Sequence, residues 1–210
     1  MTKLWVIPKS CRNLPIENLG DRFGAANELI QLLRNPNFKA PSNDFREEWT
    51  LWIKTNLHSL ICTREFYVSP SGPSTTKGEF LTLDMAVEEK EFPKRIVLAV
   101  ESEIDDTKYR QMRIEQDCEK LLAIKAPFKL MIFSSEKHGF TNEKAVEAFQ
   151  LYLEPYGQHL QGETYIFVDY NENNLEGING SFIAHIWQSE LNGPQTPITL
   201  LPVSSATPPL

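Results

Sequence analysis

Two acidic residues follow an apolar run in the segment IVLAVESE, residues 96–103. Alternate residues of a strand point to the same face, so the carboxylates of Glu101 and Glu103 are expected on one side. Like charges that close repel each other, and partial burial makes the repulsion worse. The spacing therefore predicts either a bound cation between the two acids or a strand that has already ended in solvent. Both interpretations stay open from these residues alone.

A third acid, Asp84, stands in the apolar stretch LTLDMAV. A carboxylate in the middle of a strand needs a partner, because burying an unpaired charge is costly. That partner is a metal ion, or else Arg95 or a backbone group. The strands expected over 79–88 and 95–103 are joined by a short link and so form an antiparallel hairpin. Asp84 then meets Glu101 if the chain bends or the register slips.

These acids together suit a divalent cation. Mg²⁺ or Mn²⁺ prefers oxygen ligands and is commonly held by one or two carboxylates with waters and substrate phosphate. Asp84, Glu101 and the backbone carbonyl of Ser102 form such a half-open set. Glu103 is then placed to hold or deprotonate an attacking water. This combination is typical of metal-assisted phosphodiester hydrolysis.

The elements that position the acids follow from hydrophobic periodicity. A strand, a helix and a strand over 95–135 predict a parallel, right-handed crossover that follows the hairpin. The expected fold class is therefore α/β, with a mixed central sheet flanked by helices. The helices are expected over 18–34, 45–60, 105–127 and 142–155, and the strands over 61–69, 79–89, 95–103, 128–135, 163–172 and 181–190.

Three regions are distinguished along the chain. Residues 1–43 are expected to form an N-terminal helical extension, residues 44–190 the core domain, and residues 191–210 a flexible tail rich in proline. No apolar stretch approaches the length of a membrane span or a signal peptide. The three cysteines include no CxxC pair, which favours reduced thiols and a cytoplasmic protein that binds no membrane.

Composition excludes some functions. The 210 residues are 41% hydrophobic and 23% charged, which is ordinary for a globular protein with a sizeable core. The net charge of −7 argues against nucleic-acid binding by bulk charge, though a local basic rim around an acidic metal site remains compatible with it. The four histidines show no metal-ligand spacing, and no dinucleotide, P-loop or hydrolase-elbow motif occurs.

The order of these residues resembles a known family. Asp84 is followed after sixteen residues by Glu101-Ser102-Glu103, and then by DCEKLLAIKAPFKLMIF from Asp117 onward. This pattern resembles the core of the PD-(D/E)xK nuclease superfamily over roughly residues 44–170, including its αβββαβ order. The resemblance implies a restriction-endonuclease-like fold, with Asp84 as the first acid and Glu101 as the second.

The resemblance also implies roles for three further residues. Glu103 stands where the family usually has lysine, although a minority of its restriction enzymes carry glutamate there. Lys120 would be that lysine relocated to the following helix, and Glu48 would support the metal from the first helix of the core. Their plainer interpretations are an exposed helix lysine for Lys120 and a favourable charge at a helix N-terminus for Glu48.

The function implied by the resemblance is Mg²⁺- or Mn²⁺-dependent hydrolysis of DNA, by an endonuclease that acts as a homodimer. A second hypothesis keeps the same fold without catalysis. The protein would then be an inactive relative that binds nucleic acid or another protein, because the usual lysine is replaced by Glu103.

Overall fold

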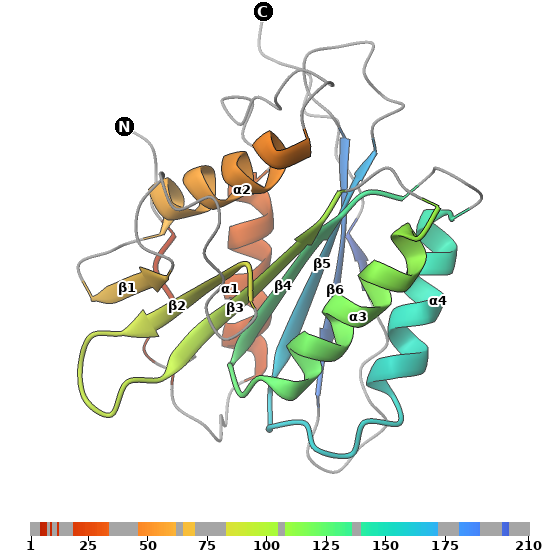
Figure 1. Cartoon of the computed structure of the whole chain (residues 1–210). Helices are drawn as coiled ribbons and strands as arrows, with labels where there is room; N and C mark the ends of the chain where they lie inside the picture. Colours follow the sequence, from red (N-terminus) through yellow and green to blue (C-terminus); the bar gives the residue numbers. More distant parts are fainter. Residues whose placement is uncertain are drawn as a thin grey trace, which may run out of the picture.

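The chain forms an α/β structure around one central sheet, as the computed structural model shows (Figure 1). The structure describes residues 5–7, 9, 12, 19–33, 46–61, 65–69, 83–104, 108–135, 140–171, 181–189 and 199–201. Within these described residues, seven strands pair in chain order, so each strand neighbours the one that follows it. They are β1 (Phe66–Ser69), β2 (Met85–Glu89), β3 (Ile96–Glu103), β4 (Phe128–Phe133), β5 (Thr164–Asn171), β6 (Ser181–Gln188) and β7 (Thr199–Leu201).

The sheet is mixed, as expected. Strands β1, β2 and β3 form an antiparallel meander, and β3, β4 and β5 are parallel. Strands β6 and β7 return antiparallel. The three parallel strands therefore end at the same edge of the sheet, and Glu101 and Glu103 lie there at the end of β3.

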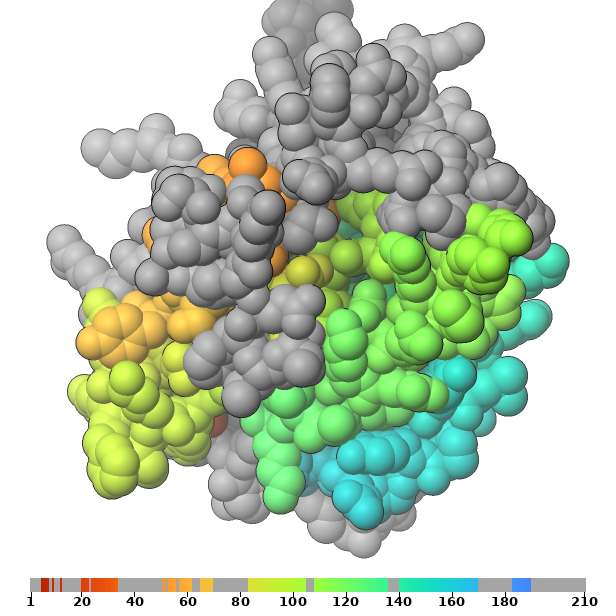
Figure 2. All heavy atoms as spheres, in the orientation of Figure 1, coloured from red at the N-terminus to blue at the C-terminus, as the bar shows by residue number. Residues whose placement is uncertain are grey.

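Helices cover both faces of the sheet (Figure 1). On one face lie α1 (Leu19–Leu33) and α2 (Arg46–Leu60), and on the other lie α3 (Arg110–Ala123) and α4 (Asn142–Leu153). Figure 2 shows the side chains of α3 and α4 (green and cyan) forming the surface beside each other on the second face. The result is a three-layer arrangement with two cores.

Alternation along the strands divides the apolar residues between these cores. Leu98, Val100 and Leu130 face α1 and α2, whereas Ala99 and Met131 face α3 and α4. A strand buried on both faces reads as a continuous apolar run, which is why IVLAV carries no period of two. The helix α3 supplies its own stripe to the second core with Ile114, Cys118, Leu121 and Leu122.

One expectation about the elements is corrected. Asp84 was expected in mid-strand, but β2 begins at Met85, so Asp84 occupies the bend just before it. Within the tail 191–210, which was expected to be extended or flexible, Thr199–Leu201 are extended and pair with β6. The expected strand residues 79–82 lie outside the described part of the chain.

The first helix packs onto the central sheet. Ala26, Leu29 and Ile30 of α1 are fully buried in the core that also contains Val100 and Ile166. Trp5 joins them, because its indole Nε1 donates to the carbonyl of Ala25 at 2.9 Å. Residues within 1–43 therefore contribute to the core of the sheet.

None of the described helices is both long enough and apolar enough to cross a lipid bilayer.

Candidate functional site

The register of the β2–β3 hairpin brings two of the expected acids to the same level. Met85 pairs with Val100, so Asp84 and Glu101 are the next residues along the two strands, at the open end of the hairpin. The pairing shifts by one between Val87 and Glu88. Without that shift Asp84 would be level with Val100, so the slipped register that the hypothesis required is present.

Asp84 is held from two sides. Its Oδ2 accepts hydrogen bonds from the backbone amide of Ser102 at 2.9 Å and from the Ser102 hydroxyl at 2.7 Å. Its Oδ1 lies 3.5 Å from the Lys54 ammonium on α2. Ser102 therefore contacts Asp84 through its backbone amide and its hydroxyl, whereas the metal ligand expected from Ser102 was its backbone carbonyl. Arg95, the alternative partner, pairs instead with Glu89 at 2.8 Å.

Glu101 is buried at the end of β3 with 2% of its surface exposed. No described residue donates a hydrogen bond to its Oε1, although the Lys120 ammonium lies 3.5 Å away. Burial raises the pKa of Glu101 to about 9, with the charges of Asp117 and Asp84 adding to the effect and Lys120 opposing it. The interpretation of Glu101 as a solvated strand end is therefore wrong.

Lys120 projects from α3 toward two carboxylates. Its ammonium lies 2.7 Å from Asp117 Oδ1, one helical turn earlier, and 3.5 Å from Glu101 Oε1. Asp117 is itself buried, with 8% of its surface exposed. These two carboxylates and the hydrogen bond to Asp117 raise the pKa of Lys120 against the opposing effect of desolvation, which is the largest single contribution. Lys120 is therefore more than an exposed helix lysine.

For the remaining predicted residues, Glu103 and Glu48, the structure gives the position along the backbone. Glu103 is half-buried at the last position of β3, and strand alternation puts it on the same face as Glu101. Its backbone carbonyl accepts from the amide of Ser134 at 3.2 Å, which continues the β3–β4 pairing. Glu48 belongs to α2, but its side chain lies outside what the structure describes.

Two residues of this site, Asp117 and Lys54, were not predicted to belong to it. Asp117 and Lys120 are three positions apart on a helix, a spacing that brings side chains together and was readable from the sequence. Lys54 offers no such local signal. Its partner Asp84 lies in the bend before β2, thirty residues further along the chain, so the pair forms because α2 crosses this end of the hairpin.

A divalent cation would find oxygen donors here. Among the described residues, no group of three or more histidine, cysteine, aspartate or glutamate side chains converges in metal-binding geometry. The backbone positions of Asp84 and Glu101 are level with each other, and Mg²⁺ commonly takes only one or two carboxylates, with water and phosphate as its other ligands. The Oε1 of Glu101, buried and without a hydrogen bond from a described donor, fits a ligand oxygen.

A second polar network lies where β4 ends, beside Asp169 of β5 and His185 of β6. The Asp169 carboxylate accepts from the Ser135 amide at 2.8 Å, from the Ser135 hydroxyl, and from Asn142 Nδ2 at 2.7 Å. His185 Nε2 lies 3.1 Å from Asn142 Oδ1. The fully buried His185 has its pKa lowered to about 4 by desolvation, which the charge of Glu143 partly opposes. This network joins β4, β5, β6 and the start of α4.

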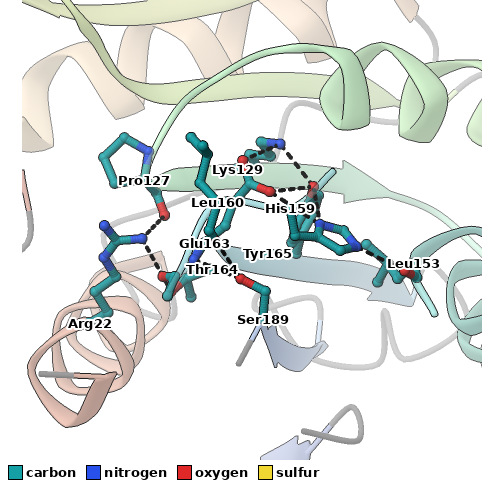
Figure 3. Close-up of polar contacts among 11 residues, drawn as sticks. Arg22, Pro127, Lys129, Leu153, His159, Leu160, Glu163, Thr164, Tyr165 and Ser189 are labelled. Carbon is teal, nitrogen blue, oxygen red and sulfur yellow. Dashed lines mark hydrogen bonds and ion pairs between the residues drawn. The ribbon is translucent and has the colours of Figure 1, made fainter. Parts of the chain in front are cut away.

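A third buried cluster occupies the other end of the sheet (Figure 3). The Lys129 ammonium contacts Glu163 Oε1 at 2.6 Å and the Tyr165 hydroxyl at 2.8 Å. Tyr165 also donates to Glu163 Oε2 at 3.1 Å, where His159 Nδ1 approaches to the same distance. Desolvation lowers the pKa of Lys129 to about 8, opposed by Glu163. Lys129 is the second residue of β4 and is level with Ala99, two residues before Glu101, so this cluster lies nearer the start of the parallel strands than the acids do.

This chain matches no protein-family model, no curated protein and no solved structure.

Proposed function

We propose that this protein is a metal-dependent nuclease that hydrolyses DNA phosphodiester bonds. One observation carries the proposal: Asp84 and Glu101 lie level at the open end of the β2–β3 hairpin, with a lysine beside each. The order α2-β1-β2-β3-α3-β4 supports it, because it is the αβββαβ order that the sequence resemblance implies. The restriction-endonuclease-like core is part of the same proposal.

The residues would divide the work as follows. Asp84 and Glu101 would hold Mg²⁺ or Mn²⁺, with the Ser102 carbonyl beside them and Glu48 in support. The ion, when bound, supplies a Lewis acid at the phosphate. Glu103 would take the proton of a water whose oxygen bonds to phosphorus while the ester P–O bond breaks. Lys120 would stabilise the charge that develops on the phosphate, and the leaving oxygen would gain a proton from solvent.

The test is nicking of supercoiled plasmid DNA by the full chain in the presence of Mn²⁺ or Mg²⁺. We expect nicked product from the wild type, and linear product if it acts as a homodimer. Asp84→Asn and Glu101→Gln should each reduce the rate by at least about 100-fold, because each removes a charged ligand. The matched control is Glu91→Gln, an exposed acid in the turn at the opposite end of the same hairpin, which should leave the rate unchanged.

The second candidate is an inactive relative that binds DNA or a protein. Two observations favour it: Glu103 replaces the usual lysine, and both Asp84 and Glu101 already lie within ion-pair distance of a lysine. Retardation of a DNA duplex in a gel by a wild type that nicks nothing would support this candidate. Nicking that survives Asp84→Asn would contradict the catalytic proposal, because the activity would then come from another site.

A further inference from the structure

Lys54 approaches the site from the face of the sheet opposite to Lys120. It lies on α2, and 13% of its side chain is exposed, against 20% for Asp84. An ammonium group that is largely withdrawn from water needs a compensating charge. For Lys54 that charge is Asp84, at 3.5 Å. The contact is within ion-pair range but longer than a strong charge-assisted hydrogen bond.

The two oxygens of Asp84 have different surroundings. Oδ2 accepts from both the amide and the hydroxyl of Ser102, which fixes the orientation of the carboxylate. Oδ1 is the oxygen that Lys54 faces. A divalent cation ligated by Asp84 would therefore bind through Oδ1, since Oδ2 is already engaged by two donors. Two positive charges at one oxygen repel strongly in a partly buried setting, so the ion and the ammonium compete for it.

Lys120, unlike Lys54, contacts two carboxylates. Its ammonium lies 2.7 Å from Asp117, and Glu101 lies on its other side at 3.5 Å. Displacing it would leave Asp117, which is 92% withdrawn from solvent, without this cation. Lys54 has the longer contact to a carboxylate whose second oxygen is satisfied by Ser102. Moving Lys54 therefore breaks the longer of these two nearest ion pairs, at 3.5 Å against 2.7 Å.

We propose that Lys54 is the exchangeable cation of this site. It neutralises Asp84 until a divalent cation binds at Oδ1, and it then turns to a non-bridging oxygen of the DNA phosphate. This inference rests on the proposed nuclease function. It makes Lys54 a competitor of the metal and a partner of the substrate, so its removal acts on the two in opposite directions.

The experiment measures Mn²⁺ binding to the full chain by isothermal titration calorimetry, together with plasmid nicking. Lys54→Met should bind Mn²⁺ at least about five-fold more tightly, because a competing charge is gone. The same variant should nick at least about 100-fold more slowly at saturating Mn²⁺, because the phosphate loses a cation. Lys54→Arg should restore the Mn²⁺ affinity of the wild type. Lys125→Met, an exposed lysine just beyond α3, is the matched control and should change neither quantity.

A variant with a damaged fold is recognised by the direction of its change in Mn²⁺ affinity. A damaged site would bind Mn²⁺ more weakly and lose activity, whereas the inference predicts tighter binding. If Lys54→Met does not fold, Lys54→Gln carries the same prediction with a polar side chain. Unchanged or weaker Mn²⁺ binding in the folded variant would overturn the inference, even where the wild type nicks DNA through Asp84. Tighter Mn²⁺ binding in a protein that never nicks DNA would support the exchange at Asp84 and reject the nuclease proposal. Absence of Mn²⁺ binding in both forms would overturn both.

Discussion

At the scale of single residues, the site depends on how one carboxylate is oriented. Ser102 contributes two donors to the same oxygen of Asp84, one from its backbone and one from its side chain. The backbone donor is supplied by any residue at this position, whereas the hydroxyl donor depends on serine. The serine between the two glutamates thus has a function of its own in holding the first acid.

We expect Ser102→Ala to lower the free energy of unfolding by about 1 kcal/mol, because Asp84 loses one of its two donors while the amide remains. Plasmid nicking should fall at the same time, since the carboxylate is held less firmly. Urea denaturation and the nicking assay measure the two effects. Ser69→Ala is the matched control: it removes a hydroxyl that donates to Glu88 at 3.3 Å, away from the site. A loss of activity equal to that of the control would contradict the role of Ser102.

At the scale of elements, the hairpin and the crossover determine which residues meet. The register shift between Val87 and Glu88 places Asp84 level with Glu101, and the parallel β3–β4 pairing keeps α3 over that end of β3. The same pairing puts Lys129 level with Ala99, two residues before Glu101, and Lys129 contacts Glu163 just before β5. A buried ion pair therefore ties β4 to the chain entering β5.

Breaking that pair is expected to be costly. Lys129→Met should lower the free energy of unfolding by about 3–5 kcal/mol, because Glu163 remains buried without its cation. Adding Glu163→Gln to the same chain should recover part of the loss, since the uncompensated charge is removed as well. Urea denaturation of the single and double variants tests this, with Lys125→Met as the exposed control. A loss below about 1 kcal/mol in the single variant would mean that Glu163 is satisfied without Lys129.

At the scale of the whole molecule, segments remote in sequence complete both cores. Arg22 of α1 is fully buried and donates to the carbonyls of Pro127 and Gly162, the residues that lead into β4 and β5 (Figure 3). Trp5 packs edge-on against Phe128 with 5.7 Å between ring centroids. The described residues near the N-terminus are therefore structural partners of the parallel strands.

The folded molecule as a whole should lose stability in mild acid through His185. Its pKa is about 4 in the folded protein against 6.5 when unfolded, so only the unfolded chain gains a proton between these values. The free energy of unfolding is therefore highest, as far as His185 is concerned, above pH 6.5. It decreases as the pH falls toward 4, by about 3 kcal/mol at most. His185→Gln should flatten the dependence of unfolding free energy on pH in this window.

The matched control for that measurement is His58→Gln, a half-buried histidine near the end of α2. Because carboxylates also titrate in acid, the quantity compared is the difference between each variant and the wild type at pH 7 and at pH 5. Equal pH dependence in the wild type and His185→Gln would show that this imidazole has the same pKa in the folded and unfolded chains, which would contradict the effect of burial.

Much of the fold could be predicted from local patterns. The apolar run before Glu101 and the stripe of α3 depend on near neighbours, so strand β3, its helix and the mixed sheet were readable. The bend at Asp84 was not, because LTLDMAV has the pattern of a continuous strand. The strand β7 was also missed, since a proline-rich tail gives no periodic signal and pairs because β6 offers an edge.

The amino-acid sequence by itself determined the order of elements and the two acids of the hairpin, because periodicity and spacing act over a few residues. The tertiary structure alone decided which cation meets which acid. Lys54 reaches Asp84 because α2 packs across the hairpin, and Glu101 is buried because α3 folds back over β3. Charges separated along the chain interact only when packing brings them together, and burial is a property of the assembled layers.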